Sequence, residues 1–185
     1  MNFILLIFFS TMLLSEQKYN EPSFILLDAQ DNIEIRQYNE YIVAKTSISL
    51  NNNESDNNMF RVLASYIFGK NEKKQSIPMT APVTTFENDT SQNMLFYMLN
   101  TEDINTLPNP AGQNITLEKF SLGKCAVISF SWFVNDKKIN KYTNKLQKFL
   151  DDNGYIQQSP FMVNRYDPPW KLPFLRRNEI LVKIK

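Results

Sequence analysis

The sequence predicts an α+β fold in which two amphipathic helices cover a mostly antiparallel sheet. Apolar and polar residues alternate along several short segments, which is typical of half-buried strands. Two longer segments instead repeat apolar residues at helical spacing. The order strand, strand, helix, strand, strand occurs twice along the 185 residues. A long unit that occurs only twice indicates one pseudo-symmetric domain and not a solenoid.

The internal repeat appears when the chain is laid on itself with an offset of 82 residues. IEIRQY at residues 33–38 then falls on ITLEKF at residues 115–120, and Pro78 falls on Pro160. We therefore expect pseudo-repeats over residues 30–100 and 113–185, joined by a proline-rich connector.

In the first half, the pattern predicts strands at residues 33–38, 41–48, 79–86 and 94–99, with residues 24–28 as a candidate edge strand. The first helix follows cap-type residues and ends before a glycine. Its apolar positions are Met59, Val62, Leu63, Tyr66 and Ile67.

In the second half, the pattern predicts strands at residues 115–120, 124–134, 161–166 and 179–184. The second helix lies between Asp136, as its cap, and Gly154. Its apolar positions are Ile139, Tyr142, Leu146, Phe149 and Leu150.

Composition excludes several kinds of chemistry. The chain has no histidine, so it holds no Ser-His-Asp triad and no histidine-ligated zinc or haem. Its single cysteine, Cys125, excludes an intrachain disulfide and lies in an apolar run, which predicts an inert buried thiol. Twenty basic and nineteen acidic residues give a net charge of +1, which does not favour nucleic acid as a partner. A binding protein is therefore favoured over an enzyme.

The N-terminus predicts entry into the secretory pathway. Residues 3–14 are almost entirely apolar, but such a run is shorter than the ~20 residues that span a bilayer. We expect a signal peptide at residues 1–15, no stable membrane insertion after its removal, and a secreted protein or one in a vesicular or vacuolar lumen. Sequons at Asn53, Asn88 and Asn114 agree with that route and predict a glycoprotein.

Three motifs are more specific than generic strands and loops. They are IEIRQY at residues 33–38, IPMTAPV at residues 77–83, and YDPPW at residues 166–170 followed by FLRRNE at residues 174–179. In this order and spacing they resemble the SOUL family of haem-binding proteins over residues 22–185. The resemblance implies a distorted antiparallel β-barrel of about eight strands with two flanking helices. It also implies affinity for haem and related tetrapyrroles, generally without enzymatic turnover.

Haem needs an apolar slot with cationic groups at its mouth. The resemblance places that slot along the first helix and a facing strand, and Arg61 is a candidate partner for a propionate. The expected haem-binding residues are Phe60, Arg61, Leu63, Ala64, Ile67, Met162 and Tyr166. The same apolar stripe equally fits a helix that faces the core.

Without histidine, haem is expected to be held non-covalently, by apolar contact and charge, in a monomer that carries, buffers or scavenges it. Two alternatives stay open on the same scaffold: a hydrolase of small hydrophobic molecules with Glu34 or Glu179 as base, and an interaction module that binds an apolar peptide. Two structural expectations complete the analysis. Arg176 and Arg177, beside Glu179, are expected to form structural ion pairs that position the final strand, and Tyr166 and Trp170 are expected to pack a rigid turn.

Overall fold

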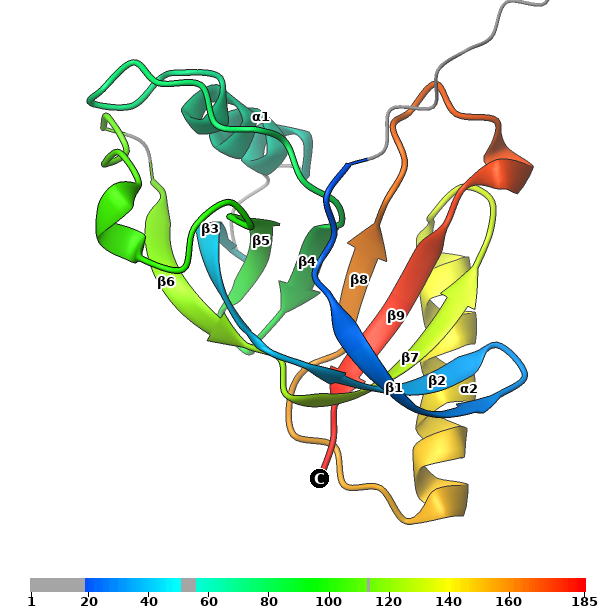
Figure 1. Ribbon diagram of the computed structural model, residues 1–185. Helices are drawn as coiled ribbons and strands as arrows, with labels where there is room; N and C mark the ends of the chain where they lie inside the picture. Colours follow the sequence, from blue (N-terminus) through cyan, green and yellow to red (C-terminus); the bar gives the residue numbers. More distant parts are fainter. Residues whose placement is uncertain (1–18, 51–55, 113) are drawn as a thin grey trace, which may run out of the picture.

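The computed structural model describes residues 19–50, 56–112 and 114–185. Its strands form one antiparallel sheet of nine that curls into a half-barrel, in the order β1-β2-β7-β9-β8-β4-β5-β3-β6 (Figure 1). The elements are β1 (Phe24–Gln30), β2 (Ile33–Tyr38), β3 (Glu40–Ser49), α1 (Asp56–Ile67), β4 (Val83–Glu87), β5 (Ser91–Tyr97), the 3-10 turn η1 (Ile104–Thr106), β6 (Thr116–Ser121), β7 (Lys124–Phe130), α2 (Asp136–Asn153), β8 (Met162–Arg165), the 3-10 turn η2 (Pro173–Leu175) and β9 (Asn178–Lys183).

The predicted α+β class with two helices is confirmed. The sheet has nine strands because the candidate edge strand at residues 24–28 forms β1, which pairs with β2 alone among the described strands. The order of elements recurs in the two halves, whereas the residue match at the 82-residue offset and the domain boundaries stay predictions. The predicted signal peptide and Asn53 lie outside the described residues.

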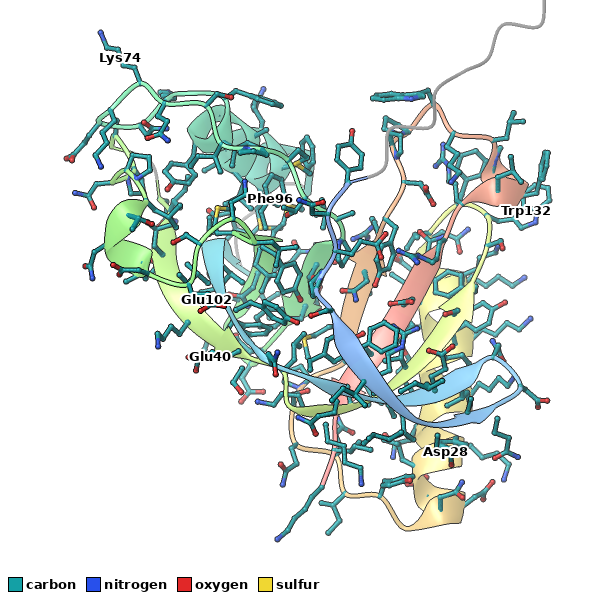
Figure 2. All side chains as sticks on the ribbon, in the orientation of Figure 1. Asp28, Glu40, Lys74, Phe96, Glu102 and Trp132 are labelled. Carbon is teal, nitrogen blue, oxygen red and sulfur yellow. The ribbon has the colours of Figure 1, made fainter. Side chains whose placement is uncertain are left out.

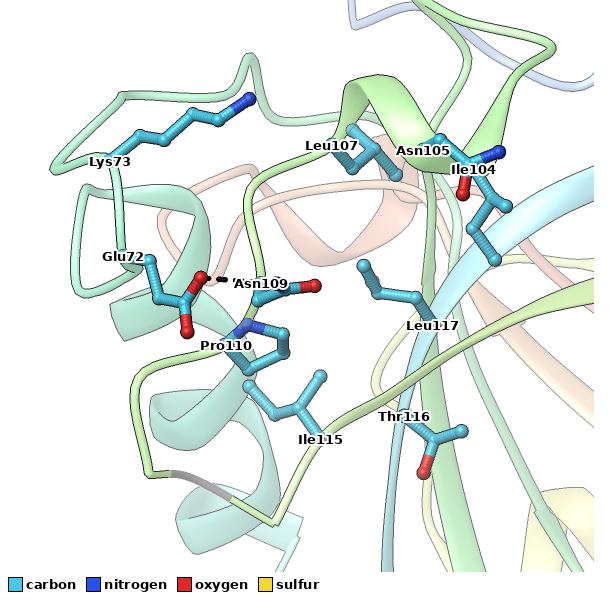
Figure 3. Close-up of a pocket in the computed structure, with 10 residues that line it drawn as sticks. All are labelled: Glu72, Lys73, Ile104, Asn105, Leu107, Asn109, Pro110, Ile115, Thr116 and Leu117. Carbon is cyan, nitrogen blue, oxygen red and sulfur yellow. Dashed lines mark hydrogen bonds between the residues drawn. The ribbon is translucent and has the colours of Figure 1, made fainter.

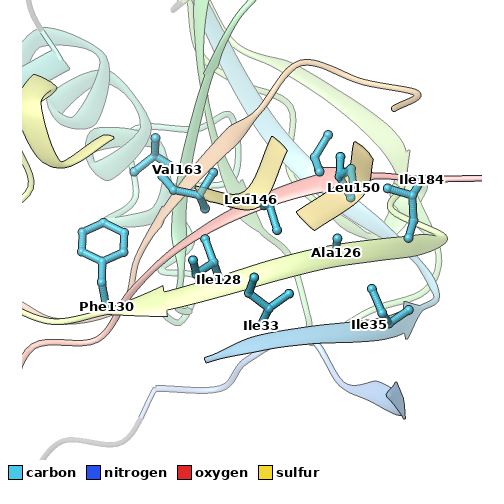
Figure 4. Packing of buried hydrophobic residues seen from close by; sticks show 11 residues of the cluster. Ile33, Ile35, Ala126, Ile128, Phe130, Leu146, Leu150, Val163 and Ile184 are labelled. Atoms are coloured by element: carbon cyan, nitrogen blue, oxygen red, sulfur yellow. The ribbon is translucent and has the colours of Figure 1, made fainter. Parts of the chain in front are cut away.

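Both helices pack on the same face of the sheet. On β5, Met94 and Phe96 join the cluster beneath α1, whereas Leu95 and Tyr97 point to the opposite face. The second half repeats this arrangement, with Ile33 of β2 and Ile128 of β7 packed beneath Leu146 and Leu150 of α2 (Figure 4). We call the helix-covered face the outer face and the opposite one the inner face. A third apolar cluster fills the inner face.

Local chemistry sets the ends of α2. The Asn135 side chain accepts a hydrogen bond from the backbone N–H of Lys138, so Asn135 is the N-cap. The prediction of Asp136 as cap was wrong by one residue; Asp136 is the first helical residue, where its charge suits the helix dipole. Gly154 ends the helix at φ 71°, a left-handed conformation that favours glycine. None of the helices in the described ranges is both long and apolar enough to cross a membrane.

Three strands are shorter than the alternation predicts, β8 by only one residue at each end. β4 begins at Val83 and not at residue 79, because Pro82 has no N–H to donate to a neighbouring strand. β7 ends at Phe130 and not at residue 134, because Trp132 adopts φ 80°, which a strand does not accommodate. The chain therefore turns away from the sheet before α2 begins.

Leu146→Ala tests the packing of α2. Leu146 is fully buried against the sheet, so truncation leaves a cavity and lowers the free energy of unfolding by about 2–5 kcal/mol. Urea denaturation measures the change. Ile156→Ala is the matched control, because Ile156 is exposed and its truncation should change stability by less than about 0.5 kcal/mol. Equal losses in the two variants would contradict this account of the core.

Candidate functional site

The inner face holds a buried ion pair between β2 and β9. Arg36 Nη2 lies 3.1 Å from Glu179 Oε1, and these side chains are only 6% and 1% exposed. The Tyr166 hydroxyl donates to the second oxygen of Glu179 at 2.5 Å. Arg36 also donates through Nη1 to the Tyr38 hydroxyl at 2.9 Å and through Nε to Glu34 at 2.6 Å. These five residues form what we call the inner network.

Strand alternation explains why the inner network faces inward. Ile35 and Ile180 belong to the cluster beneath α2, so their strand neighbours Arg36 and Glu179 project from the other face. β2 and β9 flank β7 on its two sides, and the two long side chains meet across it. Because a buried charge is costly unless it is paired, this placement requires both partners.

The electrostatics of the inner network keep it fully hydrogen-bonded. Burial, reinforced by the charge of Glu179, raises the pKa of Tyr166 well above its usual range, so its hydroxyl stays protonated and able to donate. Burial, the largest single effect, disfavours the Arg36 cation, but the charge and hydrogen bonds of Glu179 and Tyr38 together outweigh it and raise the Arg36 pKa. Both acids considered as a catalytic base, Glu34 and Glu179, are therefore engaged with one arginine.

The expectation of structural ion pairs in the C-terminal motif is confirmed for Arg177 but not for Arg176. Arg177 pairs with Glu21 and stacks on the Tyr166 ring, and Arg176 donates to backbone carbonyl groups. The Glu179 oxygens already accept hydrogen bonds from Arg36 and Tyr166, which come from the inner face. Trp170 does not pack into a turn, since it is 77% exposed.

The structure separates the expected haem-binding residues into three environments. Leu63 and Ile67 are fully buried between α1 and the sheet. Met162 lies in the inner-face cluster, with the sheet between it and α1, and Tyr166 belongs to the inner network. The remaining three, Phe60, Arg61 and Ala64, lie together on α1, where Phe60 and Arg61 are exposed.

Phe60 and Ala64 form part of a longer apolar stripe on α1. Phe68 follows Ala64 by four residues, and its N–H donates to the Ala64 carbonyl at 2.9 Å, which extends the helical pattern past Ile67. Phe60 is 43% exposed and packs its ring edge against Phe96, and Phe68 is 71% exposed. We call Phe60, Ala64 and Phe68 the α1 stripe. The sequence analysis missed Phe68, although its eight-residue spacing from Phe60 is a helical signal.

The α1 stripe has the dimensions of a seat for a flat ring. Eight residues at 1.5 Å per residue separate its two phenylalanines by about 12 Å along the axis, with a small alanine between them. Arg61 stands at one end of the stripe and donates to the neutral Asn58 side chain at 2.8 Å. An uncharged partner leaves the Arg61 charge available to an anionic group.

Two shallow cavities lie elsewhere. The larger, about 600 Å³, opens between η1, the start of β6 and the turn after α1; Figure 3 shows its aliphatic wall and the Glu72–Asn109 hydrogen bond at its rim. The second, about 460 Å³, lies beside β3 and β6. None of the expected haem-binding residues lines either one. The described part of the chain contains no cluster of three or more His, Cys, Asp or Glu residues that could hold a metal.

Cys125 is buried, as the sequence predicts. Its Sγ lies 3.4 Å from the Leu122 carbonyl oxygen, and burial raises the pKa of its thiol to about 12. A thiol that stays protonated is a poor nucleophile, so the residue is suited to packing.

Comparisons with known proteins agree with this fold. The family model described as SOUL heme-binding protein matches residues 19–183. Heme-binding protein 2 of Homo sapiens is 28% identical over 156 residues, which cover 80% of this chain and 75% of that protein. Among solved structures, a hydrolase from Listeria innocua has a TM-score of 0.58 at 8% identity and covers 86% of this chain and 94% of its own. The EcmrR C-terminal domain has a TM-score of 0.61 at 11% identity, with 83% and 96% covered. At such low identities these two structures show the fold alone.

Glu179→Gln tests the inner network. The substitution keeps the shape of the side chain but leaves Arg36 buried without its main counter-charge, which should lower the free energy of unfolding by about 3–5 kcal/mol. Chemical denaturation measures the loss. The double variant Arg36→Met/Glu179→Gln should be less destabilised than the sum of the two single variants. Additive losses would show that the two side chains are not coupled.

Alkaline pH tests the burial of Cys125. Below pH 9 the thiol is protonated in both states, but above it the unfolded chain releases a proton that the folded protein keeps until about pH 12. Folded stability should therefore fall as pH rises through this window, by at most about 1.4 kcal/mol per pH unit for this one group. Cys125→Ala removes this contribution, so its stability measured by urea denaturation should fall less steeply. Parallel pH profiles would contradict the assignment.

Proposed function

Because the chain belongs to the SOUL heme-binding protein family, we propose that it binds haem or a related tetrapyrrole non-covalently, without an axial histidine. The observation that carries the proposal is the α1 stripe, an accessible aromatic surface with a cation at its end. Carriage, buffering or scavenging in a secretory lumen is the role that follows from the sequence, with the protein as a monomer.

Apolar contact suffices for useful affinity. A macrocycle laid on the α1 stripe removes a few hundred Å² of apolar surface from water, which at ~25 cal/mol per Å² contributes several kcal/mol before the costs of association. Arg61 adds a charge-assisted contact to a propionate. Leu63 and Ile67 act from beneath, by holding α1 against the sheet.

The buried positions of other side chains support binding without an axial protein ligand. Met59, Met162 and Cys125 are soft donors that iron accepts, but all three are buried within the apolar clusters. Tyr66 is buried too, and its hydroxyl donates to the Pro108 carbonyl at 2.8 Å. None of these groups reaches a ligand on the α1 stripe while the fold stays closed.

We also propose binding in preference to catalysis. Glu34 and Glu179 are the acids considered for a hydrolase, and both pair with Arg36 and line neither cavity. A general base needs a free oxygen within reach of its substrate.

Titration with hemin and with iron-free protoporphyrin IX tests the proposal. Absorbance in the Soret region should saturate for both, with dissociation constants within about tenfold of each other, since iron ligation contributes little. Phe60→Ser/Phe68→Ser should weaken both affinities by about tenfold to a hundredfold, and Arg61→Gln by less.

Phe174→Ser is the matched control, because it removes a phenylalanine whose exposure lies between those of Phe60 and Phe68, away from α1, and should leave both affinities unchanged. No saturable binding of either ligand would overturn the proposal. Much tighter binding of hemin than of protoporphyrin would show that iron is ligated. Displacement of bound hemin by an apolar peptide would favour the interaction-module alternative.

A further inference from the structure

A second exposed apolar surface lies at another part of the molecule. It is built by the loop between β7 and α2 and by the β8–β9 connection that contains η2, and Figure 1 places these segments at the same end. Six large apolar side chains protrude there, each more than half exposed. They are Trp132, Phe133, Trp170, Leu172, Phe174 and Leu175, which we call the end patch.

The backbone holds the end patch in place. The Trp132 N–H donates to the Pro173 carbonyl at 2.9 Å, and the Asn178 side chain donates to the Trp132 carbonyl at 2.9 Å. Trp132 also adopts φ 80°, a conformation that bulky residues rarely take. Figure 2 shows Trp132 beside η2, with its side chain directed away from the sheet. The two loops thus present their apolar side chains as one surface.

Cations lie beneath these apolar tips. The Arg176 guanidinium stacks 4.7 Å from the Phe133 ring centroid and donates to the carbonyl groups of Lys171 and Pro169. Lys138 lies 5.8 Å from the Trp132 ring centroid and donates to the Ser131 carbonyl at 3.0 Å. Because these partners are carbonyl groups, neither positive charge is neutralised by them. Of the three cations in residues 168–177, Lys171 pairs with Asp167 and Arg177 with Glu21, whereas Arg176 donates to carbonyl groups.

The order of these groups in depth matches a bilayer interface. The six apolar side chains are more than half exposed, whereas Arg176 and Lys138, which contact the Phe133 and Trp132 rings, are half-buried. An interfacial protein needs this order, with apolar side chains at the acyl boundary and cations at the level of the phosphates. Tryptophan prefers this boundary, and both tryptophans of the chain lie in the end patch. We propose that the end patch docks the protein reversibly on the surface of a membrane that contains anionic lipid.

The two tryptophans make the docking measurable in the full chain. Since no tryptophan lies elsewhere, the emission spectrum reports on the end patch and not on the apolar residues 3–14. The probe is a vesicle of phosphatidylcholine with phosphatidylserine, without haem. The expected result is a blue shift of emission, quenching by lipids brominated in their acyl chains, and a weaker response with phosphatidylcholine alone or at high salt.

Leu172→Ser/Phe174→Ser/Leu175→Ser keeps both tryptophans and removes half of the apolar tips. It should raise the lipid concentration needed for the half-maximal shift on the order of a hundredfold. The matched control is Ile25→Ser/Ile156→Ser, which removes exposed apolar side chains from β1 and from the segment after α2. That variant should respond like the unchanged protein.

Three results would overturn the proposal: no spectral shift with anionic vesicles, an equal shift in the triple variant, or quenching that does not depend on bromine in the acyl chains. Sedimentation of the protein without lipid tests whether the end patch instead binds a second copy of the chain. A dimer that the triple variant abolishes, with no response to vesicles, would assign the end patch to a second copy of the chain.

Discussion

A β-strand has two faces, and in this protein both helices cover the same one. Along β5, alternate residues enter the cluster beneath α1 and the cluster of the inner face, and the other strands follow this period. The inner face therefore has no helix to cover it and closes by curvature of the sheet. Arg36 and Glu179 meet in this enclosed space, where each charge makes burial of the other tolerable. The inner network is thus a consequence of placing both helices outside.

The same constraint limits where a ligand can bind. The apolar positions that the periodicity identifies in α1 face the sheet and hold the helix on it, which buries Leu63 and Ile67. Side chains at the edge of that buried face and beyond it remain accessible, and Phe60, which still contacts Phe96, and Phe68 are the large apolar ones among them. In a chain without histidine, the soft donors Met59, Met162 and Cys125 are buried in the core, while the accessible surface of α1 offers rings and charge. That division favours recognition of the macrocycle over recognition of its iron.

The sequence predicts the elements better than the site, for physical reasons. Period-two alternation located β2 to the residue, whereas the ends of β4 and β7 depend on the missing N–H of Pro82 and on the backbone of Trp132. Periodicity groups Phe60 with Leu63 and Ile67 but does not state which side of that group faces the sheet. Met162 lies on the face opposite α1, and its register with β9, which sets that orientation, is a long-range property. The Arg36–Glu179 pair, 143 residues apart, has no local signal at all.

The α1 stripe and the end patch are two separate groups that expose aromatic side chains. Exposed aromatic residues contribute little to folding, so two separate groups of them indicate two separate contacts. The α1 stripe has one cation at its end and fits a single flat molecule, whereas the end patch spans two loops with cations behind the tips and fits an extended surface. A tetrapyrrole is itself apolar enough to partition into a bilayer. Under the two proposals, a carrier with both surfaces would meet its ligand where the ligand is concentrated, because docking through the end patch would leave the α1 stripe, on a different part of the molecule, open to receive it.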